Sequence, residues 1–289
     1  MAGYQTSLKL QNEITCGKYV LSLGKKTLIM GILNTTPDSF SDGGKFFKKD
    51  DAIRHCYKLA EDGADIIDIG GESTRPDSLP ISAEEEIKRT IPVIYEVTKN
   101  LNIPISIDTQ KAIVAKEALE AGASMVNDIS SLSDEKMPEI VAKYNIPVVI
   151  MHMQGTPATM QKNPYYKNVV EDIKKFFISR IRYAELKGIN IKNIIIDPGI
   201  GFGKNLEHNL EIFRHLNDFS ELGRPLLVGP SRKSFIGKII GADINNRLYG
   251  TLGAVCVSIM KGANIIRVHD VKETREAVSV VDSVIYRKI

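Results

Sequence analysis

Three stretches of the sequence share one local phrase: EDGADIIDIGG at residues 61–71, EAGASMVNDIS at residues 120–130 and MKGANIIRVHD at residues 260–270. In each stretch an amphipathic segment ends at the glycine in third place, and a short apolar run follows almost at once. Glycine tolerates the left-handed conformation that ends a helix. Each phrase therefore predicts a helix that leads directly into a strand.

Short apolar runs recur along the chain, each too short to form a helix. They are residues 28–34, 65–70, 104–108, 125–129, 147–152, 193–197, 225–229 and 264–269. Stretches with helical periodicity lie between them, at residues 51–61, 83–99, 110–120, 169–186, 206–219, 247–260 and 272–284. Apolar strands that alternate with amphipathic helices indicate a parallel sheet covered by helices. Eight such units fit an α/β fold of the closed (β/α)8 type, the TIM barrel. The alternative is an open doubly wound sheet, but no Gly-x-Gly-x-x-Gly opens the first unit.

The segment before the first strand, residues 1–27, is predicted to form a β-hairpin that plugs the bottom of the barrel. We therefore expect one domain over residues 1–289, with the barrel starting at residue 28. The net charge of +3 is too small to indicate a nucleic-acid-binding surface. Three widely spaced cysteines favour a reducing, cytoplasmic setting over a disulfide framework. We expect no signal peptide, because the first 25 residues contain no apolar run of the required length. No apolar run approaches the ~20 residues that span a bilayer.

Polar or ionisable side chains follow each of the predicted strands. They are Asn34, residues 72–75, Asp108, residues 127–128, His152, Asp197, residues 231–233 and residues 267–270. The C-terminal ends of the strands carry the active site in this architecture. Unpaired charge is also costly to bury, so chance would not enrich every strand end in this way. The pattern predicts an active site at that end of the barrel.

The residue types at these ends suggest two kinds of binding. Asp108, Asn127 and Asp197 could bind a flat heterocycle rich in N–H groups, because carboxylates accept hydrogen bonds and an amide both accepts and donates them. Arg267 and His269 are two residues apart and so lie on one side of the eighth strand. Beside the first strand, they would suit an anionic group such as diphosphate.

Several of these residues also have a purely structural interpretation. Asp108 and Asp197 suit the capping of the segments that follow them. His152 suits a satisfied histidine of the core, and Lys233 a solvated loop cation. Asp128 and Asp270 could simply pair with Arg or Lys side chains that line the barrel. Each interpretation remains open at the level of the sequence.

Taken together, eight stretches in order resemble the dihydropteroate synthase family over nearly the whole chain, from Leu28 to Ile285. They are GILNTTPDSFSDGG (31–44), DIGGESTRP (68–76), SIDT (106–109), VNDIS (126–130), MHMQGTP (151–157), DPGIGFGK (197–204), GPSRKSFIG (229–237) and RVHDV (267–271). The resemblance implies a transferase of folate biosynthesis. It would condense (7,8-dihydropterin-6-yl)methyl diphosphate with 4-aminobenzoate and release diphosphate and 7,8-dihydropteroate. It also implies inhibition by sulfonamide-type analogues of 4-aminobenzoate and a homodimer paired through helices late in the chain. One departure is Asp77, where many relatives have glycine.

The resemblance further assigns roles to residues of this sequence. Binding of the pterin falls to Asp108, Asn127, Met151, Asp197 and Lys233, and binding of the diphosphate to Thr74, Arg267 and His269. The 4-aminobenzoate pocket is assigned to Arg75, Pro76, Phe202 and Ser231. Asn34 would hold the metal, Mg²⁺, and the catalytic residues would be Asp38, Asp108 and Lys233. The loop at residues 34–44 would close together with residues 73–78 only when diphosphate is bound.

Three other functions remain as alternatives. A methyltetrahydrofolate-binding methyltransferase shares this barrel and pterin pocket but needs no diphosphate site. A Schiff-base aldolase could use Lys233, although a lysine of low pKa prefers an apolar, desolvated position. A catalytically inactive barrel could only bind pterins, but it would be expected to lack some of Asn34, Asp108, Lys233 and Arg267, which are all present.

Overall fold

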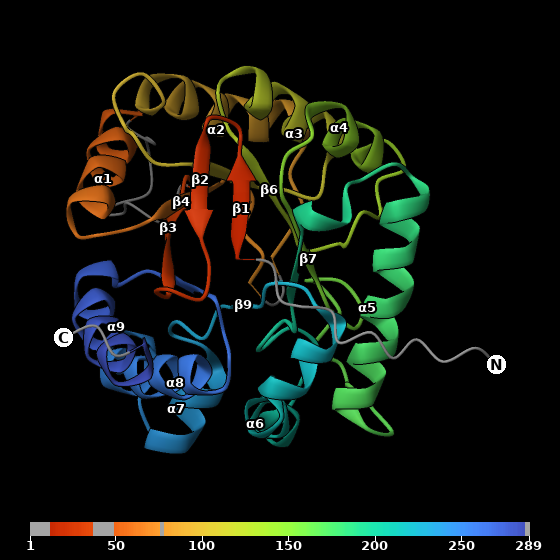
Figure 1. The fold of residues 1–289 in the computed structure, drawn as a ribbon, viewed down its shortest axis with the longest axis vertical. Coiled ribbons are helices and arrows are strands. Elements are labelled where there is room, and N and C mark those ends of the chain that lie inside the picture. The colour runs from red at the N-terminus through yellow and green to blue at the C-terminus, as the bar shows by residue number, and fades with distance from the viewer. Residues whose placement is uncertain (1–11, 37–48, 76–77, 287–289) are drawn as a thin grey trace.

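The computed structural model describes residues 12–36, 49–75 and 78–286. Its parallel strands are β3 (Leu28–Asn34), β4 (Ile66–Gly70), β5 (Ile105–Asp108), β6 (Met125–Asp128), β7 (Val148–Met151), β8 (Ile194–Asp197), β9 (Leu227–Val228) and β10 (Ile265–Val268). They pair in the order β8-β7-β6-β5-β4-β3-β10-β9. A parallel bridge between Ile196 and Leu226 joins the two ends of this order. The predicted (β/α)8 barrel is confirmed (Figure 1).

Helices surround the barrel in the described residues (Figure 1). They are α1 (Lys49–Glu61), α2 (Ala83–Val97), α3 (Ala112–Glu120), α4 (Met137–Tyr144), α5 (Val169–Leu186), α6 (Leu206–Arg214), α7 (Ser234–Ile240), α8 (Leu248–Met260) and α9 (Val271–Tyr286). Helix α4 was absent from the periodic segments of the sequence, because it has only 8 residues and carries Pro138 in its first turn. The predicted helix at 206–219 ends at Arg214 and continues as a 3₁₀ turn over Leu216–Leu222.

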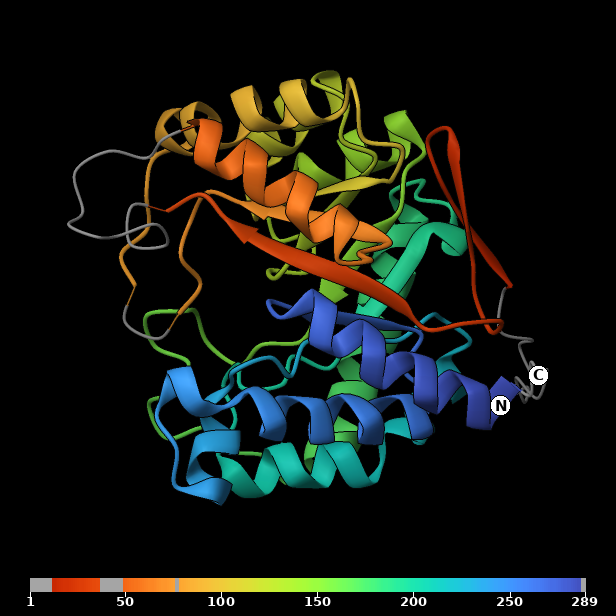
Figure 2. The same cartoon turned by 90° about the vertical axis from the view of Figure 1, so that its left-hand side faces the viewer.

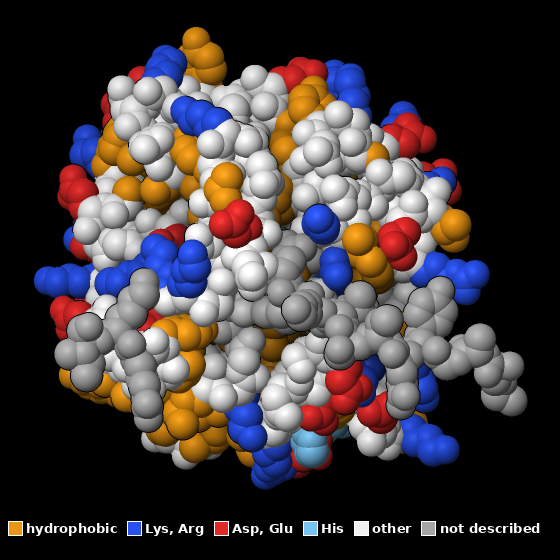
Figure 3. All heavy atoms as spheres, viewed as in Figure 1, with side chains coloured by type: hydrophobic (Ala, Val, Ile, Leu, Met, Phe, Trp, Pro, Cys, Tyr) orange, Lys and Arg blue, Asp and Glu red, His pale blue; other side chains and the backbone are white. Residues whose placement is uncertain are grey.

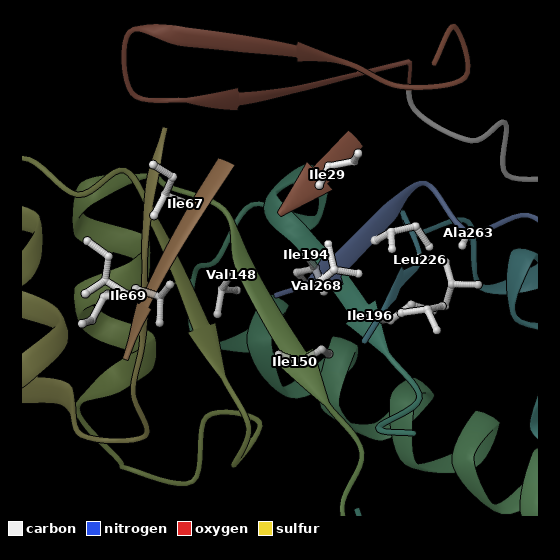
Figure 4. Packing of buried hydrophobic residues seen from close by; sticks show 14 of the residues in the cluster. Ile29, Ile67, Ile69, Val148, Ile150, Ile194, Ile196, Leu226, Ala263 and Val268 are labelled. Atoms are coloured by element: carbon white, nitrogen blue, oxygen red, sulfur yellow. The ribbon is translucent and has the colours of Figure 1, made fainter. Parts of the chain in front are cut away.

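The strands bury both of their faces, which explains why they read as apolar runs. Their outward side chains, such as Ile67, Ile69, Ile194 and Ile196, are fully buried between the strands and the helices (Figure 4). At about 25 cal/mol per Å² of apolar surface removed from water, this outer core is the main source of fold stability.

The inward side chains form a lower layer at the N-terminal ends of the strands. It consists of Leu28, Met30, Ile66, Met125, Val149, Ile195, Leu227 and Ile265. An antiparallel hairpin of β1 (Glu13–Cys16) and β2 (Tyr19–Ser22) packs Ile14, Cys16, Leu21 and Leu23 against this layer. Figure 2 shows the hairpin at one end of the barrel. For residues 12–27, the prediction that the N-terminal segment closes the bottom of the barrel is therefore confirmed.

The outer surface around the hairpin mixes charges of both signs. Lys and Arg side chains alternate with Asp and Glu around the rim of this face (Figure 3), in keeping with the net charge of +3. Within the described ranges, no helix is both long enough and apolar enough to cross a membrane.

Candidate active site

A pocket opens among the C-terminal ends of the barrel strands, where the sequence predicts the active site. Its lining consists of Thr74, Asp108, Asn127, Ile129, Met151, Asp197, Ile200, Phe202, Gly229, Lys233 and Arg267. Strand register brings the polar members together. Asp108 at the end of β5 is paired with Asn127 of β6, and Met151 at the end of β7 with Asp197 at the end of β8.

Arg267 joins two buried carboxylates across the barrel interior. Its Nε donates to Oδ2 of Asp68 at 2.6 Å, and its Nη2 donates to Oδ2 of Asp108 at 2.6 Å. The Asn127 amide also donates to Oδ2 of Asp68, at 2.9 Å. The other oxygen of Asp68 is buried and has no hydrogen-bond partner among the described residues. Asp68 is thus a site residue that the sequence did not predict. The prediction considered polar residues at strand ends, and Asp68 lies two residues before the end of β4.

Burial dominates the electrostatics of this network. It raises the pKa of Asp108, and the positive charge of Arg267 limits the rise. It also raises the pKa of Asp197, although the N–H of Gly199, 2.7 Å from Oδ1, opposes that shift. Burial alone would lower the pKa of Arg267, but Asp68 and Asp108 more than offset this and the net shift is upward. The guanidinium is therefore a fixed charge shared by two carboxylates.

Lys233 is a second cation in the lining of the pocket. Its Nζ lies 3.8 Å from the centre of the Phe202 ring, a cation–π contact. Burial and the nearby Arg267 lower the pKa of Lys233 to about 8, while Asp197 and Asp108 oppose the shift. Lys233 therefore lines the pocket, and the solvated-cation interpretation of the sequence is wrong.

An apolar cluster adjoins the pocket. It consists of Ile129, Met151, Met160 and Phe202, with Met153 packed against them. Thioether and aromatic side chains of this kind pack well against a flat ring. One side of the pocket therefore offers hydrogen bonds, and the other offers contact for a ring face.

His152 lies behind this wall rather than in it. Its ring packs edge-on against Phe176, with 4.9 Å between the ring centres, and its Nδ1 lies 3.1 Å from Nζ of Lys204. Burial lowers the pKa of His152 to about 2, so the imidazole is neutral. The structural interpretation of His152 as a satisfied core histidine is confirmed. The buried lysine beside it was quoted within a sequence motif but given no role there.

Ser231 and His269 contact each other instead of lining the pocket. The Ser231 hydroxyl lies 2.9 Å from Nδ1 of His269 and accepts the His269 backbone N–H at 3.2 Å. Burial and the neighbouring Arg267 lower the pKa of His269 to about 3, which makes it neutral. The Ser231 hydroxyl therefore holds the His269 ring in place at the start of the segment after β10.

The sequence also allowed Asp108 and Asp197 to cap the segments that follow them, and only one of them does so. Asp108 does not cap α3. The carboxylate of Asp134 accepts the backbone N–H of Ala112 at the start of that helix, at 2.9 Å, and Asp108 accepts a hydrogen bond from Arg267. Asp197 does accept the N–H of Gly199, two residues along the chain. It therefore combines a turn-stabilising role with its place in the pocket.

The remaining predicted residues lie toward the mouth. Asn34 ends β3 and is partly exposed, and Arg75 is exposed. Asp38 and Pro76 lie outside the described residues, as does most of the loop at 34–44, so the predictions made for them stay predictions. In the described part of the chain, no group of three or more His, Cys, Asp or Glu side chains is placed to hold a metal ion.

Comparison with known proteins agrees with this geometry. The family model described as pterin binding enzyme matches residues 30–269. A dihydropteroate synthase of Synechocystis is 47% identical over 271 residues, which cover 92% of this chain and 93% of that protein. The Yersinia pestis dihydropteroate synthase, solved with a sulfonamide drug, superposes with a TM-score of 0.90 at 43% identity, covering 94% of this chain and 98% of that one. The Xanthomonas albilineans enzyme in complex with 7,8-dihydropteroate gives 0.86 at 39% identity, with the same coverage.

Proposed function

Because this chain belongs to the family of pterin-binding enzymes, we propose how its pocket is divided between the parts of two substrates. The chain is a transferase with dihydropteroate synthase activity. It condenses (7,8-dihydropterin-6-yl)methyl diphosphate with 4-aminobenzoate to give 7,8-dihydropteroate and diphosphate, a step of folate synthesis. The similarities favour this activity over the methyltetrahydrofolate-binding methyltransferase.

The pterin ring occupies the polar floor of the pocket. Asp108, Asn127 and Asp197 face it with acceptors and one amide donor, and Lys233 adds a cationic donor. The ring face lies against Met151. This convergence of groups from four strand ends is the observation that carries the proposal, since it matches a flat heterocycle rich in N–H groups.

The diphosphate lies beside Arg267. A guanidinium has five N–H donors, and the carboxylates of Asp68 and Asp108 take two of them. The rest remain for an anion, and Thr74 lines the same pocket. We also keep His269 assigned to the diphosphate, although it lies just outside that lining. The network also fixes the plane of the guanidinium before the ligand arrives, so less side-chain entropy is lost on binding.

We assign Mg²⁺ to the side chain of Asn34. Mg²⁺ is usually held by one or two protein oxygens together with substrate phosphates. A single amide oxygen at the end of β3 fits that mode, whereas a cage built from protein alone would need more ligands. When bound, the ion would neutralise part of the charge on the departing diphosphate.

The chemistry is a dissociative substitution at the pterin methylene. Arg267 stabilises the negative charge that develops on the leaving group. The dihydropterin ring delocalises the positive charge left behind, and the carboxylates of Asp108 and Asp197 stabilise it. The aniline nitrogen of 4-aminobenzoate then forms the new C–N bond and gives up a proton. No side-chain nucleophile is required, and Phe202 and Arg75 are assigned to the 4-aminobenzoate side of the pocket.

The assay of this function follows diphosphate release. Release should require both Mg²⁺ and 4-aminobenzoate, and 7,8-dihydropteroate should form in equal amount. A sulfonamide analogue should compete with 4-aminobenzoate. Release that is the same with and without 4-aminobenzoate would contradict the synthase activity, and binding of the pterin without any release would indicate an inactive pterin-binding barrel.

We also propose that two copies of the chain pair through α7 and α8. An apolar groove runs between α6, α7 and α8, lined by Leu210, Phe213, Phe235, Ile236, Ile239, Ile240, Gly250, Gly253, Ala254 and Val257. Around it Ile239 is 55% exposed and Met260 is 72% exposed. Contiguous exposed apolar surface of this kind marks an interaction site, and a second copy can cover it symmetrically.

Helix α9 offers a rival surface, because Val280 is 67% exposed. Two charged substitutions separate these surfaces in sedimentation measurements. Val257→Glu on α8 should convert a dimer to a monomer, while Val280→Glu on α9 should leave the dimer intact. The reverse result would move the interface to α9.

A further inference from the structure

Lys204 is a buried lysine that the proposed reaction does not use. It lies between β8 and α6 and is only 3% exposed. Its Nζ donates to the carbonyl of Phe202 at 2.8 Å and to the carbonyl of His152 at 3.2 Å, and it lies 3.1 Å from Nδ1 of His152. An ammonium has three donors, and the two carbonyls take two of them. Burial lowers the pKa of Lys204 to about 7. Lysine is almost never fully buried unless its charge has partners, so these contacts require an explanation.

The contacts join the exits of two neighbouring strands. His152 follows β7, and the segment at 198–205 follows β8. The two backbones lie against each other: a Cβ on Gly199 would come 2.0 Å from the carbonyl oxygen of His152, and one on Gly203 would come 2.5 Å from that of Gln154. Both glycines have positive φ, 67° and 63°. These glycines allow the segment at 198–205 to lie against the segment after β7. Lys204 connects the two segments, because it donates to a carbonyl of each.

Other side chains hold the flanks of this segment. Gln161 donates to the carbonyl of Gly201 at 2.8 Å, and Tyr166 donates to that of Gly203 at 2.8 Å. The carbonyl of Phe202, between these two glycines, receives its side-chain hydrogen bond from Lys204. Each of the three carbonyls thus has its own donor, and Lys204 serves the residue that lines the pocket.

We propose that Lys204 is a positioning residue that sets the Phe202 wall of the pocket. The Phe202 ring lies under Nζ of Lys233, 3.8 Å away. A Cβ on Gly201 would meet Cδ of Lys233 at 3.1 Å, so the wall and the lysine are packed together. A shift of the Phe202 backbone would therefore displace the aromatic surface assigned to 4-aminobenzoate. Of the groups assigned to the pterin, Asp108 and Asn127 stand on other strands and would not move, whereas Lys233 packs against the wall. Binding of the pterin should therefore be disturbed less than binding of 4-aminobenzoate. This inference rests on the proposed function.

The test is Lys204→Met, which keeps the length of the side chain and removes its donors. We expect the KM for 4-aminobenzoate to rise at least tenfold, while the Kd for the pterin diphosphate rises by a clearly smaller factor. Phe202→Ala should give the same pattern, and the double variant should be no worse than Phe202→Ala alone. Lys192→Met, at the exposed opposite end of β8, is the matched control and should change neither constant.

Equal losses for both substrates, or unchanged constants in a folded Lys204→Met protein, would overturn the assignment. If Lys204→Met does not fold, Lys204→Gln keeps a shorter donor and should give a smaller rise in the same KM. A crystal structure of the folded variant supplies a readout that does not depend on activity: the Phe202 ring should move away from Lys233 by about 1 Å or more. If the wild type forms no dihydropteroate, the proposed function fails, and the position of Phe202 still decides the role of Lys204.

Discussion

The interior of the barrel consists of two layers that differ by only two residues along the same strands. Ile66 of β4 belongs to the lower layer, and Asp68 belongs to the upper one. On β8, Ile195 is likewise followed by Asp197. The lower layer is apolar and closed off by the N-terminal hairpin, whereas the upper layer is polar and opens into the pocket. A strand repeats its direction every two residues, so one strand supplies both environments.

The two layers differ in what a single change can break. In the lower layer, truncating a side chain removes packing and leaves a cavity, but it leaves no buried charge without a partner. In the upper layer the buried charges depend on each other, because Arg267 holds two carboxylates at 2.6 Å each. Removing one partner of a buried pair is more costly than the pair is favourable. The upper layer should therefore respond to substitution in both stability and binding, and the lower layer in stability alone.

The largest effect is expected for Arg267→Met. The change leaves Asp68 and Asp108 buried without their cation, which should cost about 3–5 kcal/mol of unfolding free energy at pH 8. It should also weaken binding of the pterin diphosphate far more than binding of the pterin alcohol. Urea denaturation and calorimetry measure the two effects. Arg214→Met removes an exposed pair with Glu211 and serves as the control, with a loss below about 1 kcal/mol.

The loss in Arg267→Met should depend on pH in a defined direction. Burial already raises the pKa of Asp108, and without Arg267 nothing comparable limits the rise. When the pKa of a carboxyl group is raised in the folded state, the folded protein holds a proton that the unfolded chain has released. The free energy of unfolding therefore decreases as the pH rises toward the folded-state pKa. The deficit should therefore be smaller at pH 5 than at pH 8. A deficit that does not change with pH would show that Asp108 is not stranded.

A change of similar size, in stability alone, is expected for Ile66→Ala in the lower layer. The side chain is fully buried, and its truncation should cost about 2–5 kcal/mol of unfolding free energy. The KM values should stay within twofold, because the hydrogen-bonding groups of the pocket lie one layer above. If KM rises along with the loss of stability, the two layers are mechanically coupled and the comparison between them fails.

The sequence predicted these layers unevenly. Runs of Ile and Val revealed the strands because both faces of each strand are buried, and polar strand ends revealed most of the pocket. Asp68 does not stand out in the sequence, because it lies inside its strand and its partner Arg267 is 199 residues away in the chain. Lys204 was missed for a related reason. Its partners are mainly backbone carbonyls, which no side-chain pattern can show.

A smaller effect is expected for Asp68→Asn, two residues along from Ile66. The amide keeps the shape and one acceptor, so the hydrogen bonds from Arg267 and Asn127 can persist without the charge. The charge-assisted hydrogen bond from Arg267 contributes about 1.5–3 kcal/mol to holding the guanidinium in place. A less firmly held guanidinium should lower the affinity for the pterin diphosphate by up to about tenfold. The loss of stability should be less than that of Ile66→Ala. Unchanged affinity by calorimetry would make Asp68 a support of the fold only.

The smallest effect is expected for the pH dependence of pterin affinity, which reports the charge of Lys233. It tests whether every charge of the upper layer already has a partner before the ligand binds. Burial and Arg267 lower the pKa of Lys233 to about 8, so its charge is lost as the pH rises through that value. Pterin affinity should therefore fall about tenfold between pH 7 and pH 9, since the protonated fraction falls tenfold per unit above the pKa. Other groups titrate nearby, and the measurement is best expressed as the ratio of wild-type affinity to that of Lys233→Met, in which their effects cancel. The ratio should shrink as the pH rises. A constant ratio would mean that Asp197 and Asp108 keep Lys233 charged to a higher pH. In that case the charges of the upper layer would all be paired within the protein, and Lys233 would have no charge left unpaired for the ligand.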